Sequence, residues 1–402
     1  MQLTANDVAT AHAAIRPHIV RTPTVAAPRL GEPIGVRLFL KLDNLQYTGS
    51  FKDRGSCLKL QHLAAASPRP SGVIAASAGN HAQGVAYHAR RLGLPATIVM
   101  PITTPFSKIE RTEGLGAHVE LHGESVAECT VHARATAATK GLAFVHPYDD
   151  PLVVAGQGTA AIELLEDQPQ LDTIVVPIGG GGLAAGTALW AKHVNPRIRI
   201  FGVQTAMCAP MRARLRGETI PVLRTHTLAD GIAVKTPGEI PAAILADHLE
   251  DVLLVDEVDI ENAVQVLAAQ QKVVAEGAGA AGVAAVLHHA GLFRGHDVGV
   301  MVCGGNIDRR MLSTVLLRGL KRDGKIAKLR ISIHDVPGVL SRVTQLIGAS
   351  GADVIDIEHQ RLFNNLAPRQ AELDVVMETK GAAHVERILH TLGEAGFPAI
   401  TM

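Results

Sequence analysis

The sequence predicts an α/β fold with a mainly parallel sheet, followed by a smaller domain whose elements run βαββαβ. Three observations predict this. Short runs rich in Val and Ile alternate with Ala-rich segments of helical spacing up to about residue 320, which is typical of parallel sheets covered by helices. Several of these runs end at glycine clusters. After residue 328 the apolar pattern changes to period two, interrupted by segments of helical period, and this change indicates a separate domain.

The strands of the first domain are expected where the apolar runs lie, at 36–42, 72–76, 96–100, 173–178, 197–204, 251–256 and 297–303. In open α/β sheets, ligands bind beyond the carboxyl ends of strands. The segments that follow three of these strands, 77–80, 179–182 and 303–306, are therefore expected to face one crevice.

The second domain is expected at 328–402, after a charged linker at 321–327 that contains Gly324. Its elements are expected as a strand (Leu329, Ile331, Ile333), a helix (Leu340, Val343, Leu346, Ile347), two strands (Val354, Ile357; Leu373, Val375, Met377), a helix (Val385, Ile388, Leu389, Leu392) and a last strand. This is the order of a ferredoxin-like unit.

Composition favours small-molecule chemistry. Lys plus Arg and Asp plus Glu both number 38, so no net charge draws the protein to nucleic acid or to acidic membranes. The four cysteines form no Cys-x-x-Cys pair, which disfavours a zinc site and a disulfide framework and fits a reducing cytoplasm. The N-terminus lacks the apolar run of a secretory signal. We therefore expect a soluble, cytoplasmic protein.

The segment Ser50-Phe51-Lys52-Asp53-Arg54-Gly55 places Lys52 between a short polar loop and a helix expected to begin near Gly55. A solvated lysine at a helix start is one interpretation. The other is a Schiff-base nucleophile, which requires surroundings that favour the neutral amine. That interpretation needs a cofactor site nearby.

Such a site is indicated by a strand that runs into Gly179, Gly180, Gly181 and Gly182 and then into Leu183 and an Ala-rich helix. Backbone N–H groups without side chains approach a phosphate closely, and the helix N-terminus adds its dipole. A turn with close helix packing is the alternative. The NAD fingerprint expects an acidic residue at the end of the next strand, where this chain has Gln204, and no Gly-Lys-Ser/Thr follows the glycines.

Two further motifs follow strands. In Ser77-Ala78-Gly79-Asn80-His81, the helix start could hold a substrate carboxylate, and helix capping by Ser77 or Asn80 is the alternative. In Cys303-Gly304-Gly305-Asn306, the Cys303 thiol could face a ring nitrogen, and simple packing of a buried cysteine is the alternative.

The four motifs, in this order, resemble those of the fold-type-II pyridoxal-phosphate enzymes, and specifically medium-length threonine ammonia-lyases (threonine dehydratases) with one C-terminal ACT-like domain. The resemblance covers essentially the whole chain. It implies a two-lobed, tryptophan synthase β-like catalytic domain at 1–320, with the smaller lobe roughly at 41–146 inserted in the larger one. It also implies that residues 328–402 form an ACT-like regulatory domain.

The resemblance implies roles for the motif residues. Lys52 would bind pyridoxal 5′-phosphate covalently and act as the catalytic base, and Asn80 would contact the cofactor's phenolic oxygen. The other cofactor contacts would come from Phe51, Gly179, Gly180, Gly181, Gly182, Leu183, Gly231, Glu276 and Cys303, with Cys303 near the ring nitrogen. The substrate carboxylate would bind to Ser77, Ala78, Gly79, Asn80 and His81.

The implied activity is dehydration and deamination of L-threonine to 2-oxobutanoate and ammonia, with L-serine giving pyruvate. A serine racemase is the nearest alternative, but similar racemases have a serine at the position of Ala78, and alanine cannot exchange a proton. Such relatives also carry a metal-binding glutamate near Gln204, so no metal is expected here. An amino-acid sensor with a degenerate catalytic domain is the non-enzymatic alternative.

The turn formed by Asp335, Val336, Pro337, Gly338, Val339 and Leu340 resembles the ligand loop of ACT domains. Gly338 would permit close backbone approach to an amino-acid effector; a plain strand-to-helix turn is the alternative. Isoleucine, valine and threonine all remain candidate effectors, and a role in isoleucine biosynthesis and a catabolic role both remain open. The resemblance favours a homodimer or homotetramer.

Overall fold

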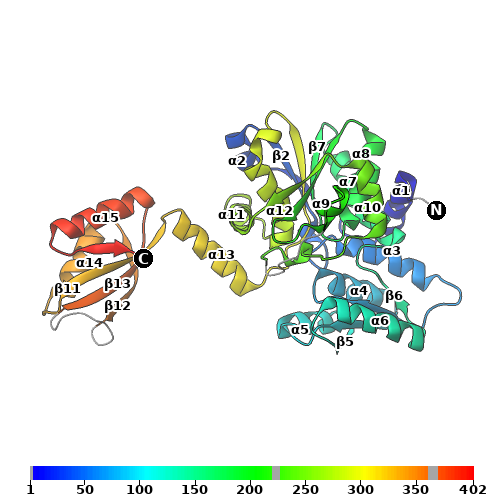
Figure 1. Ribbon diagram of the computed structural model, residues 1–402, viewed down its shortest axis with the longest axis horizontal. Helices are drawn as coiled ribbons and strands as arrows, with labels where there is room; N and C mark the ends of the chain where they lie inside the picture. The colour runs from blue at the N-terminus through cyan, green and yellow to red at the C-terminus, as the bar shows by residue number, and fades with distance from the viewer. Residues whose placement is uncertain (1–2, 220–226, 361–369) are drawn as a thin grey trace. The chain divides into compact units, whose positions relative to one another are not determined.

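The structure is a computed structural model that describes residues 3–219, 227–360 and 370–402. The chain divides into two compact units, Met1–Ile307 and Asp308–Met402, and many of their elements are labelled in Figure 1. Among the described residues, no helix is both long enough and apolar enough to cross a membrane.

The larger lobe of the first unit is built on a sheet with the strand order β1-β2-β10-β7-β8-β9. These strands are β1 (Thr24–Ala26), β2 (Arg37–Leu42), β7 (Thr173–Pro177), β8 (Arg199–Thr205), β9 (Asp251–Val255) and β10 (Asp297–Val302). All neighbours pair in parallel except the edge strand β1. The central strand β7 is buried along its whole length, as expected for a parallel sheet covered on both faces.

The helices of this lobe are α1 (Ala5–Ile15), α2 (Pro28–Gly31), α3 (Lys52–Ala64), α7 (Pro151–Asp167), α8 (Gly182–Val194), α9 (Pro210–Leu215), α10 (Glu239–His248), α11 (Glu257–Val266) and α12 (Gly277–His288). Short turns of 3-10 helix lie at η1 (Glu32–Ile34), η2 (Asp43–Leu45), η3 (Asp230–Ile232) and η5 (Ala290–Leu292), and a π-helical turn lies at η4 (Leu267–Gln271). Helices α7 and α8 approach closely at Gly186. A Cβ at this position would lie only 2.4 Å from the Val154 carbonyl oxygen, so the close approach requires glycine. Helix α12 packs on the sheet strands.

The smaller lobe has its own parallel sheet with the order β5-β4-β3-β6. Its strands are β3 (Val73–Ala76), β4 (Ala96–Met100), β5 (His118–Leu121) and β6 (Ala143–Phe144), and its helices are α4 (Asn80–Arg91), α5 (Phe106–Gly114) and α6 (Val126–Lys140). The chain forms this lobe between β2 and β7 of the larger sheet. Helix α3 packs against both α7 and α4, and it therefore lies where the two lobes meet (Figure 1).

The second unit contains α13 (Arg309–Arg322), β11 (Ile326–His334), α14 (Val339–Ala349), β12 (Asp353–Gln360), β13 (Gln370–Glu378), α15 (Ala382–Glu394) and β14 (Ala399–Thr401). Its sheet has the order β12-β13-β11-β14, and all its strands pair antiparallel. The elements from β11 onward follow the order βαββαβ read from the apolar pattern. Buried Leu329, Ile331 and Ile333 lie on one face of β11.

Three details of this unit differ from the sequence interpretation. The unit begins at Asp308 rather than near residue 321, because helix α13 (Arg309–Arg322) spans the expected boundary. Strand β11 also begins inside the expected linker. Leu340, expected on the core face of its helix, is 39% exposed, whereas Val343 and Ile347 are buried.

Candidate active site

Lys52 is the first residue of helix α3, with Phe51 at the N-cap, so this helix begins before Gly55, where the sequence pattern placed its start. The Lys52 Nζ atom donates a hydrogen bond of 2.8 Å to the Pro147 carbonyl oxygen. Burial lowers the pKa of the amine to about 8, although Cys303 and Glu276 act in the opposite direction. Such an amine is neutral in a substantial fraction of molecules near neutral pH, as a nucleophile or base requires.

The segment before Lys52 lies against the end of strand β10. Ser50 and Gly304 form an isolated antiparallel bridge, and the Phe51 N–H donates to the Cys303 carbonyl oxygen at 3.0 Å. The lysine motif and the cysteine motif are thus joined through their backbones. The Ser50 hydroxyl is buried, and no hydrogen-bond partner for it is found among the described residues. A buried hydroxyl in that state is a candidate to contact a bound group.

The four glycines join strand β7 to helix α8. Gly181 is the N-cap of α8 and has a φ of 100°, which side chains with a Cβ rarely adopt. A Cβ at Gly180 would lie 2.2 Å from the Tyr148 ring, and one at Gly179 would lie 3.3 Å from the Gly231 carbonyl oxygen. The sequence-predicted residue Gly231 therefore lies beside this loop. A glycine loop at a helix N-terminus suits an anionic group such as phosphate.

Asn80 and Glu276 come from different lobes and are in direct contact. The Asn80 Nδ2 atom donates to Glu276 Oε1 at 2.6 Å. The Asn306 Nδ2 atom in turn donates to Asn80 Oδ1 at 2.8 Å. Burial, followed by the charge of Asp230, raises the pKa of Glu276 to about 7. A Cβ at Gly304 would lie only 2.2 Å from Glu276 Oε1, so glycine is required beside this carboxyl group.

The segment from Ser77 to His81 lies at the start of helix α4. Ser77 Oγ accepts a bond from the Gly79 N–H at 3.2 Å, and within the described residues no side chain caps α4, whose N-cap is Gly79. The helix start is thus open to an anion. His81 Nε2 lies 3.0 Å from the Val145 carbonyl oxygen, and burial lowers the pKa of His81 to about 3. This ring is therefore neutral and donates from Nε2.

The sequence interpretation missed the segment from His146 to Asp150, which links the lobes beside Lys52. Pro147 accepts the bond from Lys52, and the Tyr148 hydroxyl donates to the Thr236 carbonyl oxygen at 3.0 Å. Asp150 caps helix α7 and pairs with Lys59 at 2.6 Å. The Asp-Asp-Pro run that starts α7 is a helix-start signal, but the contact of Pro147 with Lys52 has no sequence signature.

No metal ligand was expected near Gln204. The structure shows which groups surround the Gln204 side chain. Gln204 Nε2 donates to the Ile178 carbonyl oxygen at 3.2 Å, and Gln204 Oε1 accepts from the Arg212 N–H at 3.0 Å. Among the described residues, no group of three or more His, Cys, Asp or Glu side chains is arranged to hold a metal ion.

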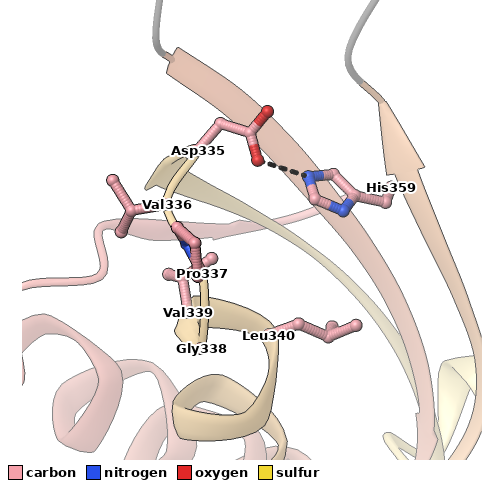
Figure 2. Close-up of a pocket in the computed structure, with 7 residues that line it drawn as sticks. All are labelled: Asp335, Val336, Pro337, Gly338, Val339, Leu340 and His359. Atoms are coloured by element: carbon pink, nitrogen blue, oxygen red, sulfur yellow. Dashed lines mark ion pairs between the residues drawn. The ribbon is translucent and has the colours of Figure 1, made fainter.

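A pocket of about 230 Å³ lies in the second unit. Its lining consists of Asp335, Val336, Pro337, Gly338, Val339, Leu340 and His359. Figure 2 shows the Asp335 carboxylate and the His359 ring facing each other, with Nε2 and Oδ1 3.8 Å apart. Gly338 has a φ of 89° and caps helix α14. All six residues of the expected ligand loop, Asp335 to Leu340, thus line one pocket.

Comparisons with known proteins identify the family. Residues 15–304 match the pyridoxal-phosphate-dependent enzymes. The chain is 40% identical to an L-threonine ammonia-lyase of Thermotoga maritima over 98% of both chains. It also resembles the structure of threonine deaminase isoform 2 from Solanum lycopersicum (TM-score 0.74, 32% identity, 78% of this chain and 88% of that chain). Maize serine racemase is similar as well (TM-score 0.74, 32% identity, 80% of this chain and 99% of that chain).

The residues present fit pyridoxal phosphate. The Lys52 amine has a lowered pKa, and the glycine loop at the start of α8 suits a phosphate. The buried Ser50 hydroxyl, next to Phe51, has no hydrogen-bond partner among the described residues. Burial also raises the pKa of the Cys303 thiol, which keeps it neutral. The chain belongs to the family of pyridoxal-phosphate-dependent enzymes, and within it to the L-threonine ammonia-lyases.

Proposed function

We propose that the protein converts L-threonine to 2-oxobutanoate and ammonia, and L-serine to pyruvate. The observation that carries this proposal is the Lys52 amine, whose pKa is lowered to about 8 in a chain that matches an L-threonine ammonia-lyase over 98% of its length. Loss of the lysine or of the glycine loop would have favoured a degenerate sensor, and the chain retains both.

The residues of the site have separable tasks. Gly179 to Leu183 and the N-terminus of α8 would hold the phosphate, and Asn80 would hold the phenolic oxygen. Phe51 would pack beside the ring. Pyridoxal phosphate supplies an electron sink for the substrate's α-carbon when it is bound. The neutral amine of Lys52 would take the α-proton, and the open start of α4, from Ser77 to His81, would orient the substrate carboxylate.

The Cys303 thiol would influence which reaction follows removal of the α-proton. A neutral thiol is a weak hydrogen-bond donor, and burial raises the pKa of Cys303 so that it remains neutral. Next to the ring nitrogen, such a group would favour prompt loss of the β-hydroxyl over the chemistry of a transaminase. Racemisation would be at most a side activity, because Ala78 has no group to exchange a proton on the face opposite Lys52.

The second unit is proposed to be an ACT-like regulatory domain. Its βαββαβ order and its pocket at Asp335 to Leu340 support this proposal, as does the match to the Thermotoga enzyme, which extends over it. We propose a branched-chain amino acid as the effector and a homodimer or homotetramer as the assembly. Control by isoleucine would fit a role in isoleucine biosynthesis.

The deciding experiment compares the purified wild type with Lys52→Ala. The absorbance of the bound cofactor and 2-oxo-acid release from L-threonine, L-serine and D-serine are recorded, with and without isoleucine. Lys192→Ala is the matched control, because Lys192 lies at the end of α8 and bonds only a nearby carbonyl in the described structure. Oxo-acid release by wild type and by this control, but not by Lys52→Ala, is the expected result.

Other outcomes separate the alternatives. A protein that binds the cofactor but releases no oxo acid from L-threonine would contradict the lyase assignment. Rapid interconversion of L- and D-serine would favour a racemase despite Ala78. A protein that binds no cofactor would contradict the roles given to Lys52 and the glycine loop.

A further inference from the structure

Helix α5 of the smaller lobe makes two polar contacts with the larger lobe. Lys108 Nζ lies 3.2 Å from Asp230 Oδ2, and Asp230 directly precedes Gly231 in η3. Arg111 Nη1 donates to Asn306 Oδ1 at 3.4 Å. Residues three apart lie on the same side of a helix, so Lys108 and Arg111 form one cationic face that spans the junction between the lobes.

The contact made by Arg111 continues into the candidate active site. Asn306 Nδ2 donates to Asn80 Oδ1 at 2.8 Å and also to the Thr48 carbonyl oxygen at 2.7 Å. Asn80 Nδ2 then donates to Glu276 Oε1 at 2.6 Å. The donors and acceptors alternate between the smaller lobe (Arg111, Asn80) and the larger lobe (Asn306, Glu276). Separation of the lobes would therefore break this chain of hydrogen bonds at each step.

We propose that helix α5 is a clasp that holds the two lobes together beside the site, and that Lys108 and Arg111 are positioning residues for Asn80 and Glu276. The inference deepens the proposed function, on which its kinetic test rests. The family resemblance assigned no role to either cation. Neither side chain needs to touch the substrate, because each acts through a residue of the larger lobe.

The Lys108–Asp230 contact of the clasp is exposed to solvent, which allows the two lobes to separate. The side chains of Lys108 and Asp230 are 38% and 63% exposed. Exposed ion pairs are weak and are screened by salt. A contact of this strength favours the closed arrangement without locking it, so a substrate can enter and a product can leave.

The clasp also affects the charge of the site. Burial and then Asp230 raise the pKa of Glu276, whereas Asn80, Lys108 and the backbone of Asn306 lower it. Glu276 in turn interacts with Lys52 and Cys303. Removing the charge of Lys108 and removing that of Asp230 should therefore shift the pKa of Glu276 in opposite directions. A role of α5 in folding alone would not give this opposition.

The test uses full-length Lys108→Gln, Asp230→Asn, Arg111→Gln and the double exchange of Lys108→Asp with Asp230→Lys. Arg37→Gln is the control, because Arg37 is also an exposed cation paired with an aspartate, Asp297, but this pair lies at the first residues of β2 and β10. Hydrogen exchange of the cofactor-free protein is measured at 106–114 and 230–232. KM and kcat for L-threonine are measured across pH at low and high salt.

We expect Lys108→Gln, Asp230→Asn and Arg111→Gln each to raise the rate of hydrogen exchange at both segments. Each should also raise KM about two- to fivefold at low salt, the range that a weak exposed pair implies. High salt should reduce this difference, and the double exchange should restore part of it. Glu276→Gln identifies the part of the pH profile of kcat/KM that depends on Glu276, because this variant should lack it. The midpoint of that part should move to higher pH in Lys108→Gln and to lower pH in Asp230→Asn. Arg37→Gln should behave like wild type.

Unchanged hydrogen-exchange rates at both segments in all the clasp variants would overturn the proposal. Shifts of the Glu276-dependent midpoint in the same direction in Lys108→Gln and Asp230→Asn would also overturn it. If the wild type does not turn over L-threonine but the exchange pattern changes as expected, the lyase assignment fails and the clasp stands. The two inferences can thus fail separately.

Discussion

At the scale of single residues, the site combines two groups whose pKa values are shifted toward each other. Burial lowers the pKa of Lys52 to about 8 and raises that of Glu276 to about 7. Ordinary lysine and glutamate titrate more than six units apart, at about 10.4 and 4.3. Perturbed groups of this kind gather at functional sites because proton transfer is most effective near the working pH.

The pKa of Lys52 predicts how cofactor uptake depends on pH. The neutral fraction of the amine rises about tenfold per pH unit below its pKa, so capture of pyridoxal phosphate by the cofactor-free protein should accelerate up to about pH 8 and then level off. Glu276→Gln should move this midpoint lower, because the charge of Glu276 raises the pKa of Lys52. Stopped-flow absorbance measures the rate, and a midpoint near the ordinary lysine pKa of about 10.4 would contradict the prediction.

Gly180 supplies a second prediction at this scale. In Gly180→Ala the new Cβ would meet the Tyr148 ring at 2.2–2.4 Å, so the ring must move and its bond to Thr236 is strained. Overpacking of this kind costs about 1–3 kcal/mol, and we expect weaker cofactor binding together with a lower free energy of unfolding.

Fluorescence titration with pyridoxal phosphate and urea denaturation check this prediction. The double variant Gly180→Ala with Tyr148→Ala removes the clash and should recover cofactor affinity in part. Gly348→Ala is the control, because within 4 Å of its Cβ position no atom is found in the described structure. Normal binding by Gly180→Ala would mean that the Tyr148 ring moves away at little cost.

At the scale of elements, helix α3 is fixed by a buried cluster of charges. Arg54, two residues after Lys52, bonds Asp43 at 2.6 and 2.8 Å and Glu163 at 2.8 Å through two nitrogens. Lys41 also bonds Glu163, at 2.7 Å. All four charges are almost completely buried and sum to zero. The cluster joins β2, η2, α3 and α7 and thereby fixes where α3 begins.

Removing Arg54 should therefore destabilise the protein strongly. Arg54→Met leaves the carboxylates of Asp43 and Glu163 with too little compensation, and breaking a buried pair costs about 3–5 kcal/mol. Denaturation with urea measures the free energy of unfolding. Arg37→Met should lower this free energy much less, because the Arg37 side chain in the Arg37–Asp297 pair is 62% exposed. A small loss in Arg54→Met would indicate that water reaches the cluster.

The sequence predicted strands better than helix ends. Runs such as 96–100 and 173–178 match β4 and β7 closely, because strands buried on both faces are continuous apolar segments. The start of α3 was placed near Gly55 because the residues before it were interpreted as a short polar loop, whereas the helix begins at Lys52. The charged segment at 321–327 was expected to be a linker because of its charges and Gly324, whereas the structure places it at the end of α13 and the start of β11.

At the scale of the whole molecule, the motifs were found from sequence but their partners were not. Lys52, Asn80, Gly180 and Cys303 stand in local patterns, each after a strand or before a helix. Pro147 stands in no motif, and Asn306 stands in the cysteine motif without a predicted partner. Their contacts join Lys52 to Pro147, 95 positions apart, and Asn306 to Asn80, 226 positions apart. Contacts at such separations depend on how the lobes meet, which local patterns do not encode.

The two units have separate cores. Buried residues such as Val176, Ile178 and Ile200 pack in the first unit, and buried residues such as Leu329, Leu373 and Ile388 pack in the second. An effector bound to the second unit, as proposed above, would occupy a site distinct from Lys52, and its control of the reaction would require a coupling free energy between the two sites.

This arrangement predicts that a change in the pocket at Asp335 to Leu340 alters regulation but not basal catalysis. Gly338 has a φ of 89°, so Gly338→Ala strains the turn that lines the pocket. We expect isoleucine binding, measured by calorimetry on the full chain, to weaken about tenfold or more, since strain of about 1–3 kcal/mol acts on the binding loop. Turnover of L-threonine without isoleucine should stay unchanged. Gly348→Ala in helix α14 of the same unit should leave both unchanged, and equal isoleucine affinity in Gly338→Ala and wild type would place the effector elsewhere.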